Sequence, residues 1–232
     1  MAVLRQRPAR LLSCLLGVAL SLGTHVVALQ SPPKHPVTGR QIANVYNGTD
    51  WLDRAEREDE EQPGRALQLI GITPGMIVAD VGAGTGYMTV RLALRVGPKG
   101  KVYANDLQSA MIETLRDKVR RQKLTNVETV QGTETDARLP ASALDLALLV
   151  DVYHEFWHPQ EMLRSIRQSL KPNGRLVLLE FRKEDASLPI LETHKMSVAG
   201  ARTEVEAEGF TFDRVLEQLP RQHILIFRKP AQ

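Results

Sequence analysis

The chain has 232 residues, carries 30 Lys+Arg against 27 Asp+Glu, and is 43% hydrophobic. This length and composition predict one globular domain with a sizeable core, and they argue against solenoid and disordered classes. The formal charge of +3 comes from Arg5, Arg7 and Arg10, and the other 27 basic residues balance the 27 acidic ones. A neutral body argues against a nucleic-acid-binding face.

The first 28 residues have the layout of a secretory signal peptide, with three arginines, the apolar run LLSCLLGVALSLG and small residues at the end. We therefore predict a periplasmic or secreted protein with a leader over 1–28 and a polar linker over 29–50. An uncleaved membrane anchor is one alternative, because the apolar stretch extends loosely to Leu29. A mitochondrial presequence is the other, because arginines are present and no acid precedes Asp50. The single cysteine, Cys14, lies in this leader, so the body has no cysteine nucleophile or disulfide.

Predicted elements then follow in a regular order. A charged segment over 51–69 has a helical pattern, and from residue 76 onward apolar strand-like runs alternate with amphipathic helix-like runs. The expected strands are 76–81, 101–106, 127–132, 144–152 and 175–181, and the expected helices are 87–96, 109–123, 160–170 and 197–208. This alternation predicts an α/β fold with a doubly wound, mostly parallel seven-stranded sheet. The last two runs, FTFDRVLEQL and HILIFRK, are joined so tightly that they must be antiparallel, and we expect a reversed strand at the sheet edge.

The stretch IVADVGAGTGYMT runs from an apolar strand through Asp80 into three glycines at alternate positions. Ligands of open parallel sheets bind beyond the carboxyl ends of the strands, and glycines let the backbone approach a ligand closely. The dinucleotide pattern G-x-G-x-x-G fails because its third glycine position falls on Tyr87, and no Walker lysine follows. Asp106 ends the next strand, where a carboxylate can accept hydrogen bonds from ribose hydroxyls.

The run from Asp80 to Gly86, DVGAGTG, resembles the pattern (D/E)-x-G-x-G-x-G of class I S-adenosylmethionine-dependent methyltransferases. The resemblance covers residues 64–229. It is closest to ubiquinone and menaquinone biosynthesis methylases and to small bacterial methyltransferases with secretory leaders, through DVYHEFWHPQEML, KPNGRLVLLEFR, HKMSVAGARTEVEAEGF and PRQHILIF. It implies a Rossmann-like fold, S-adenosyl-L-methionine as cofactor and methyl transfer to a small-molecule acceptor.

The resemblance also implies which residues bind the cofactor. These are Asp80, Gly82, Ala83, Gly84, Gly86, Asp106, Leu107, Asp136 and Asp151. In the stretch GTETDARLP, Asp136 resembles the family's acid near the adenine amino group. The usual pattern puts that acid directly after the glycine, so Glu134 is the alternative.

Candidate catalytic residues follow the fourth parallel strand. Methyl transfer from a sulfonium is an in-line displacement in which positioning dominates, and a base is needed only when the acceptor keeps its proton near neutral pH. Asp151, His154 and Glu155 lie at the carboxyl end of this strand, and an imidazole suits general-base work. Alternatively, these side chains only cap a helix or fix the loop. We predict no metal site, because Asp151 has no obvious partner carboxylates.

Other ionisable side chains have weaker indications. We expect Glu180 to be structural, His158 to start a helix, His194 and Lys195 to lie on a segment that covers the acceptor pocket, and Arg221 and His223 to lie on a surface hairpin.

Two alternatives to an enzyme of this class stay open. A non-catalytic binding or scaffold protein on a methyltransferase fold is motivated by the leader, because S-adenosylmethionine is made in the cytoplasm. A pocket filled by side chains would favour it. A dinucleotide-dependent oxidoreductase is disfavoured by Tyr87.

Overall fold

The computed structural model describes residues 32–231, so the predicted signal peptide over 1–28 and the first residues of the predicted linker lie outside the described residues. The strands are β1 (Ile77–Val81), β2 (Lys101–Asp106), β3 (Val127–Gln131), β4 (Leu144–Val150), β5 (Leu170–Arg182), β6 (Lys195–Met196), β7 (Thr211–Leu216) and β8 (Gln222–Arg228). The helices are α1 (Arg57–Glu61), α2 (Pro63–Ile70), α3 (Tyr87–Val96), α4 (Ser109–Arg121), α5 (Pro159–Ser169) and α6 (Val198–Glu206), with short 3₁₀ helices η1 (Tyr153–Glu155) and η2 (Glu192–His194).

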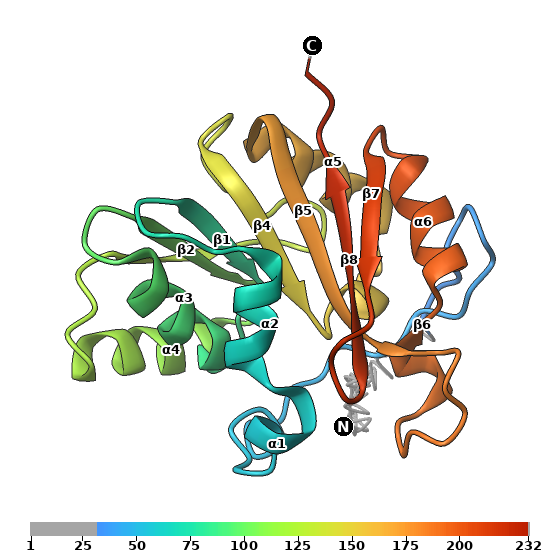
Figure 1. Cartoon of the computed structure of the whole chain (residues 1–232), viewed down its shortest axis with the longest axis horizontal. Coiled ribbons are helices and arrows are strands. Elements are labelled where there is room, and N and C mark those ends of the chain that lie inside the picture. Colours follow the sequence, from blue (N-terminus) through green and yellow to red (C-terminus); the bar gives the residue numbers. More distant parts are fainter. Residues whose placement is uncertain (1–31, 232) are drawn as a thin grey trace, which may run out of the picture. The chain divides into compact units, whose positions relative to one another are not determined.

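The strands form one sheet in the order β3-β2-β1-β4-β5-β8-β7, with the two residues of β6 paired to β5 off this path (Figure 1). Strands β1 to β5 are parallel, and β8 is antiparallel to both of its neighbours. The mostly parallel sheet is confirmed. The reversed strand, however, lies one position inside the edge, and β7 takes the edge. The reason is burial, because β8 is buried at every residue except Arg228, whereas no residue of β7 is buried.

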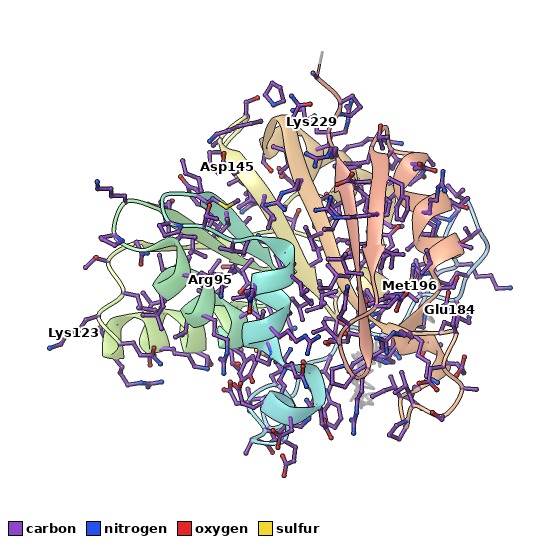
Figure 2. The ribbon with its side chains drawn as sticks, viewed as in Figure 1. Arg95, Lys123, Asp145, Glu184, Met196 and Lys229 are labelled. Carbon is purple, nitrogen blue, oxygen red and sulfur yellow. The ribbon has the colours of Figure 1, made fainter. Side chains whose placement is uncertain are left out.

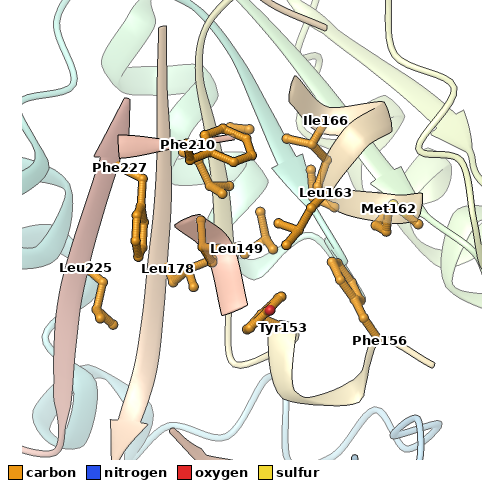
Figure 3. Packing of buried hydrophobic residues seen from close by; sticks show 14 of the residues in the cluster. Leu149, Tyr153, Phe156, Met162, Leu163, Ile166, Leu178, Phe210, Leu225 and Phe227 are labelled. Carbon is orange, nitrogen blue, oxygen red and sulfur yellow. The ribbon is translucent and has the colours of Figure 1, made fainter. Parts of the chain in front are cut away.

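Helices cover both faces of the sheet. Successive side chains of β1 point to opposite faces of the sheet. Val78 therefore lies on the face covered by α2 and α3, and Ala79 lies on the face covered by α5 and α6. Figure 3 shows the second face, where Leu163 and Ile166 of α5 pack with side chains of β4 and β5 such as Leu149. The chain order reverses between β1 and β4, and this switch point is where ligands of such sheets bind.

Residues 32–50, which we call the N-terminal strap, pack onto this domain instead of leading up to it as a linker. Ile42 and Ala43 are buried, and the Ala43 N–H donates to the His154 carbonyl at 3.0 Å. The Arg40 guanidinium forms two hydrogen bonds with the buried Glu204 carboxylate of α6, at 3.0 and 3.1 Å. Apolar anchors and a buried ion pair therefore hold the strap against the end of the sheet.

The predicted helix over 51–69 is shorter than expected. Residues 51–56 form turns, and Gln62 takes a left-handed conformation (φ +50°) between α1 and α2. Charged side chains such as Lys123, just beyond α4, extend outward from the fold (Figure 2). Of the helices in the described part of the chain, none combines the length and apolar character needed to span a bilayer.

Candidate functional site

The loop between β1 and α3 approaches neighbouring segments closely at its glycines. Gly82 (φ +71°) faces Val152, where an added Cβ would lie 2.4 Å from Val152 Cγ2. Gly84 (φ +52°) faces Leu52, where the same atom would lie 2.9 Å from Cδ1, and Gly86 (φ +85°) precedes α3. Left-handed backbone and lack of space both require glycine here. The loop after β1 therefore has the close backbone approach without side chains that its glycines predicted.

Asp106 joins this loop to the end of β2. Its Oδ2 accepts a hydrogen bond from the Gly84 N–H at 2.9 Å, and its Oδ1 accepts one from the Gln108 N–H at 2.9 Å. Burial raises the pKa of Asp106, and these backbone N–H groups partly oppose that rise. The glycine loop and the second-strand carboxylate are therefore in direct contact, and the neighbouring Ala83 and Leu107 line the same cavity.

Asp80, at the carboxyl end of β1, is buried beneath the loop. Its Oδ2 accepts a hydrogen bond from Thr89 Oγ1 at 2.5 Å. Burial raises the pKa of Asp80 to about 6, against the opposing effects of Thr89 and of the Arg57 guanidinium. The carboxylate lines the cavity and can attract a cationic ligand group there.

A cavity of about 380 Å³ lies at the switch point of the sheet. This volume is in the range of small-molecule sites. Polar groups of the glycine loop and β2 line one part, and an apolar part is lined by Phe156, Met162, Phe181, Pro189, Ile190 and Leu191. The N-terminal strap and the turn after it add Val45, Tyr46, Trp51 and Leu52. No motif in the sequence indicated these last residues, because their distance along the chain from the glycine loop hides their proximity.

Three ionisable side chains converge on the cavity wall. His154 Nδ1 lies 2.6 Å from Glu180 Oε2, and His154 Nε2 lies 3.2 Å from His194 Nδ1. Glu155 Oε1 lies 3.9 Å from His154 Nε2 and 4.0 Å from His194 Nδ1. We call His154, Glu155 and His194 the polar triad.

Burial and neighbouring charges shift the pKa values of the polar triad. Burial lowers the pKa of His154, but the Glu180 carboxylate together with Glu155 and Asp151 outweighs burial, and the net shift is upward. Burial raises the pKa of Glu155 to about 7, although His154 opposes the rise. Burial, followed by the charge of His154, lowers the pKa of His194.

Asp151 follows β4 in a left-handed conformation (φ +51°), which is uncommon for a residue with a side chain. Its Oδ2 accepts a hydrogen bond from Gln222 Nε2 at 2.7 Å, and its buried Oδ1 has no hydrogen-bond partner among residues 32–231. Burial, followed by the charges of Glu61 and Glu180, raises the pKa of Asp151 well above its usual range. Asp151 lines the cavity, as the sequence predicted.

The structure does not bring Asp136 or its alternative Glu134 to the cavity. Asp136 Oδ1 accepts a hydrogen bond from Ser165 Oγ of α5 at 2.7 Å, and Glu134 pairs on the surface with His158 at 3.5 Å. Thr133 is the residue of this loop that lines the cavity. Three residues, 133–135, separate Gly132 from Asp136, and the acids of this loop face α5 and the surface instead.

The structure agrees with some of the remaining predictions and differs from others. Glu180 is structural as expected, because it accepts hydrogen bonds from the Tyr153 N–H as well as from His154. His158 directly precedes α5 as expected, and its side chain makes no capping hydrogen bond. His194 lines the cavity, but Lys195 is buried and pairs with Glu192. His223 is not on a surface hairpin; it is fully buried in β8, where it pairs with Glu180 of β5. Arg221 pairs with Glu60 at 2.9 Å.

Comparison with known proteins agrees with this geometry. Residues 78–174 match the family model described as a methyltransferase domain. A ubiquinone/menaquinone biosynthesis C-methyltransferase UbiE of Ectopseudomonas mendocina is 31% identical over 68% of this chain and 62% of its own length. The corresponding protein of Pseudomonas paraeruginosa is 33% identical over 53% of this chain and 48% of its own length. The chain thus spans about half to three fifths of these relatives.

Solved structures show the same fold. A SAM dependent methyltransferase from Aquifex aeolicus superimposes with a TM-score of 0.73 at 28% identity, over 78% of this chain and 96% of that one. The [4+2]-cyclase SpnF superimposes with a TM-score of 0.63 at 18% identity, over 85% and 89%, which shows the shared fold alone. The glycine loop, the sheet order and these similarities identify a class I S-adenosylmethionine-dependent methyltransferase domain in this chain. The two sequence relatives named above, from Ectopseudomonas mendocina and Pseudomonas paraeruginosa, are both UbiE proteins.

Proposed function

We propose that this protein transfers a methyl group from S-adenosylmethionine to a small, largely apolar acceptor. The observation that carries the proposal is the contact between Asp106 and the Gly84 N–H beside an open cavity. Two donors bind the Asp106 carboxylate, which leaves lone pairs for ribose hydroxyls. When bound, the cofactor supplies an electrophilic methyl group. The chain's own residues orient the two reactants and exclude water.

The acceptor would occupy the apolar part of the cavity. Phe156, Phe181 and Ile190 line this part and can make apolar contacts with the acceptor. The polar triad supplies the ionisable groups of the cavity wall. The UbiE relatives are named as C-methyltransferases of quinone biosynthesis. An apolar cavity is compatible with an aromatic acceptor of that kind, with the polar triad meeting its polar group.

A non-catalytic scaffold on this fold is the second candidate. The fold is shared with a cyclase, so fold alone leaves the reaction open. A scaffold would tolerate side chains filling the pocket, whereas here about 380 Å³ stays open beside an intact glycine loop. This openness supports the enzyme.

We further propose that the leader directs the protein to the periplasm or outside the cell. The support is the sequence of residues 1–28 alone. Fractionation of tagged cells with N-terminal sequencing of the mature protein tests this proposal. Full-length protein confined to the cytoplasm or to mitochondria would contradict it.

Calorimetric titration of the full-length protein with S-adenosylhomocysteine tests the cofactor proposal. We expect saturable binding that Asp106→Ala weakens at least 10-fold, because hydrogen bonds to charged groups contribute about 1.5–3 kcal/mol. Asp117→Ala, on the exposed surface of α4, is the matched control and should bind like the wild type. An absence of binding to both S-adenosylmethionine and S-adenosylhomocysteine would contradict the proposal, and a parallel titration with NADH tests the oxidoreductase alternative.

A further inference from the structure

The facing atoms of the polar triad form a triangle of the size that surrounds a small cation. Its corners are His154 Nε2, His194 Nδ1 and Glu155 Oε1, and its sides are 3.2, 3.9 and 4.0 Å. A triangle with these sides has a circumradius of about 2.2 Å, so one point lies at that distance from all three atoms. Zinc binds imidazole nitrogen at about 2.0–2.1 Å and carboxylate oxygen at about 2.0–2.2 Å.

The contacts of Glu155 argue against a simple hydrogen-bond network. Its Oε2 accepts a hydrogen bond from the Tyr46 N–H at 3.1 Å, which fixes the carboxylate. Its Oε1 stays too far from both imidazole nitrogens for a hydrogen bond, and within residues 32–231 it has no other hydrogen-bond partner. A carboxylate oxygen aimed between two imidazole nitrogens at this spacing is well placed to share a cation with them.

Glu180 supplies the support that a metal-binding histidine needs. It is fully buried and lies 2.6 Å from His154 Nδ1, so the proton of this imidazole is held on Nδ1. In the neutral form of this imidazole, the lone pair of Nε2 then faces Glu155 and His194. Carboxylates hold zinc-binding histidines in this way, and they fix both the tautomer and the ring orientation.

We propose that the polar triad binds one divalent transition-metal ion on the wall of the cavity. Two imidazoles and one carboxylate fit zinc better than magnesium, because magnesium prefers oxygen ligands. Three protein ligands leave a coordination position free, as in catalytic zinc sites. Because the triad lines the cavity, that position can take an oxygen or nitrogen of the acceptor. The acceptor part of this inference rests on the proposed function, whereas metal binding does not.

Metal titration of the full-length protein tests the proposal. The protein, purified with a tag that lacks histidine and stripped with a chelator, is titrated with Co²⁺ while its visible absorption is followed. Zinc affinity is then measured by competition with a chromophoric chelator. We expect one equivalent of either metal per chain and a cobalt spectrum typical of nitrogen and oxygen ligands.

Variants separate the triad from adventitious binding. His194→Ala removes a half-buried ligand from a short surface helix and should lower zinc affinity more than 10-fold. Glu180→Gln should lower it about 10–100-fold through the orientation of His154. The matched control is His158→Ala, which removes a surface histidine outside the triad and should leave zinc affinity unchanged. Circular dichroism and S-adenosylhomocysteine binding check that each variant is folded.

Two results would overturn the proposal. One is an absence of stoichiometric metal binding by the wild type, and the other is equal zinc affinity in the wild type and in His194→Ala. In either case the contact between His154 and His194 is an ordinary hydrogen bond. Loss of S-adenosylhomocysteine binding with metal binding intact would instead contradict only the proposed function.

Discussion

The close approach of Gly82 to Val152 allows a quantitative prediction for Gly82→Ala. The substitution places a Cβ 2.4 Å from Val152 Cγ2 and forces a non-glycine residue to adopt φ +71°. Left-handed backbone costs about 1–2 kcal/mol for an L-residue, and overpacking costs about 1–3 kcal/mol. We therefore expect the free energy of unfolding to fall by about 2–5 kcal/mol, with weaker S-adenosylhomocysteine binding because the loop must move.

Urea denaturation followed by circular dichroism measures this loss. The control is Gly75→Ala, which has a similar conformation (φ +87°) but open space at its Cβ position, so it should show the backbone cost alone. Val152→Ala in the Gly82→Ala background removes the clashing methyl groups. The double variant should therefore lose about 1–3 kcal/mol less free energy of unfolding than the sum of the losses of the two single variants. The reasoning is refuted if Gly82→Ala costs no more than Gly75→Ala, or if the two substitutions at the contact are simply additive.

Two further predictions concern buried charges. Burial raises the pKa of Asp80 from its usual 3.8 to about 6, so the folded state holds the proton more tightly than the unfolded state, and stability falls as pH rises from about 4 to about 6. Asp80→Asn should therefore flatten this pH dependence and raise the free energy of unfolding at pH 7 by roughly 3 kcal/mol in urea titrations; an unchanged slope would contradict the prediction. Arg40→Ala leaves the Glu204 carboxylate buried without its bidentate partner and should cost about 3–5 kcal/mol in the same assay. Glu204→Gln in that background should recover part of the loss, and no recovery would show that the charge is not the cause.

The sequence by itself determined most of the local elements and the meeting of the glycine loop with Asp106. The apolar periodicities fixed α3 and β2 to the residue, because strands buried on both faces and amphipathic helices have different repeat lengths. The alternate glycines after Asp80 predicted a loop without side chains at the end of β1. Asp106 ends the adjacent parallel strand β2, so its carboxylate was expected to lie beside this loop, as it does. These inferences succeed because they depend on neighbours in sequence or on adjacent parallel strands.

Only the tertiary structure decided which other side chains line the cavity. The N-terminal strap has the composition of a polar linker, yet it packs against η1 and α6 and places Tyr46 in the cavity wall. His194 lies 40 residues beyond His154 and meets it only because η2 folds back over η1. Asp136 contacts α5, although its resemblance to the family's adenine-side acid predicted a place in the cavity. Such contacts depend on how loops pack and which way side chains point, and periodicity carries no information about either.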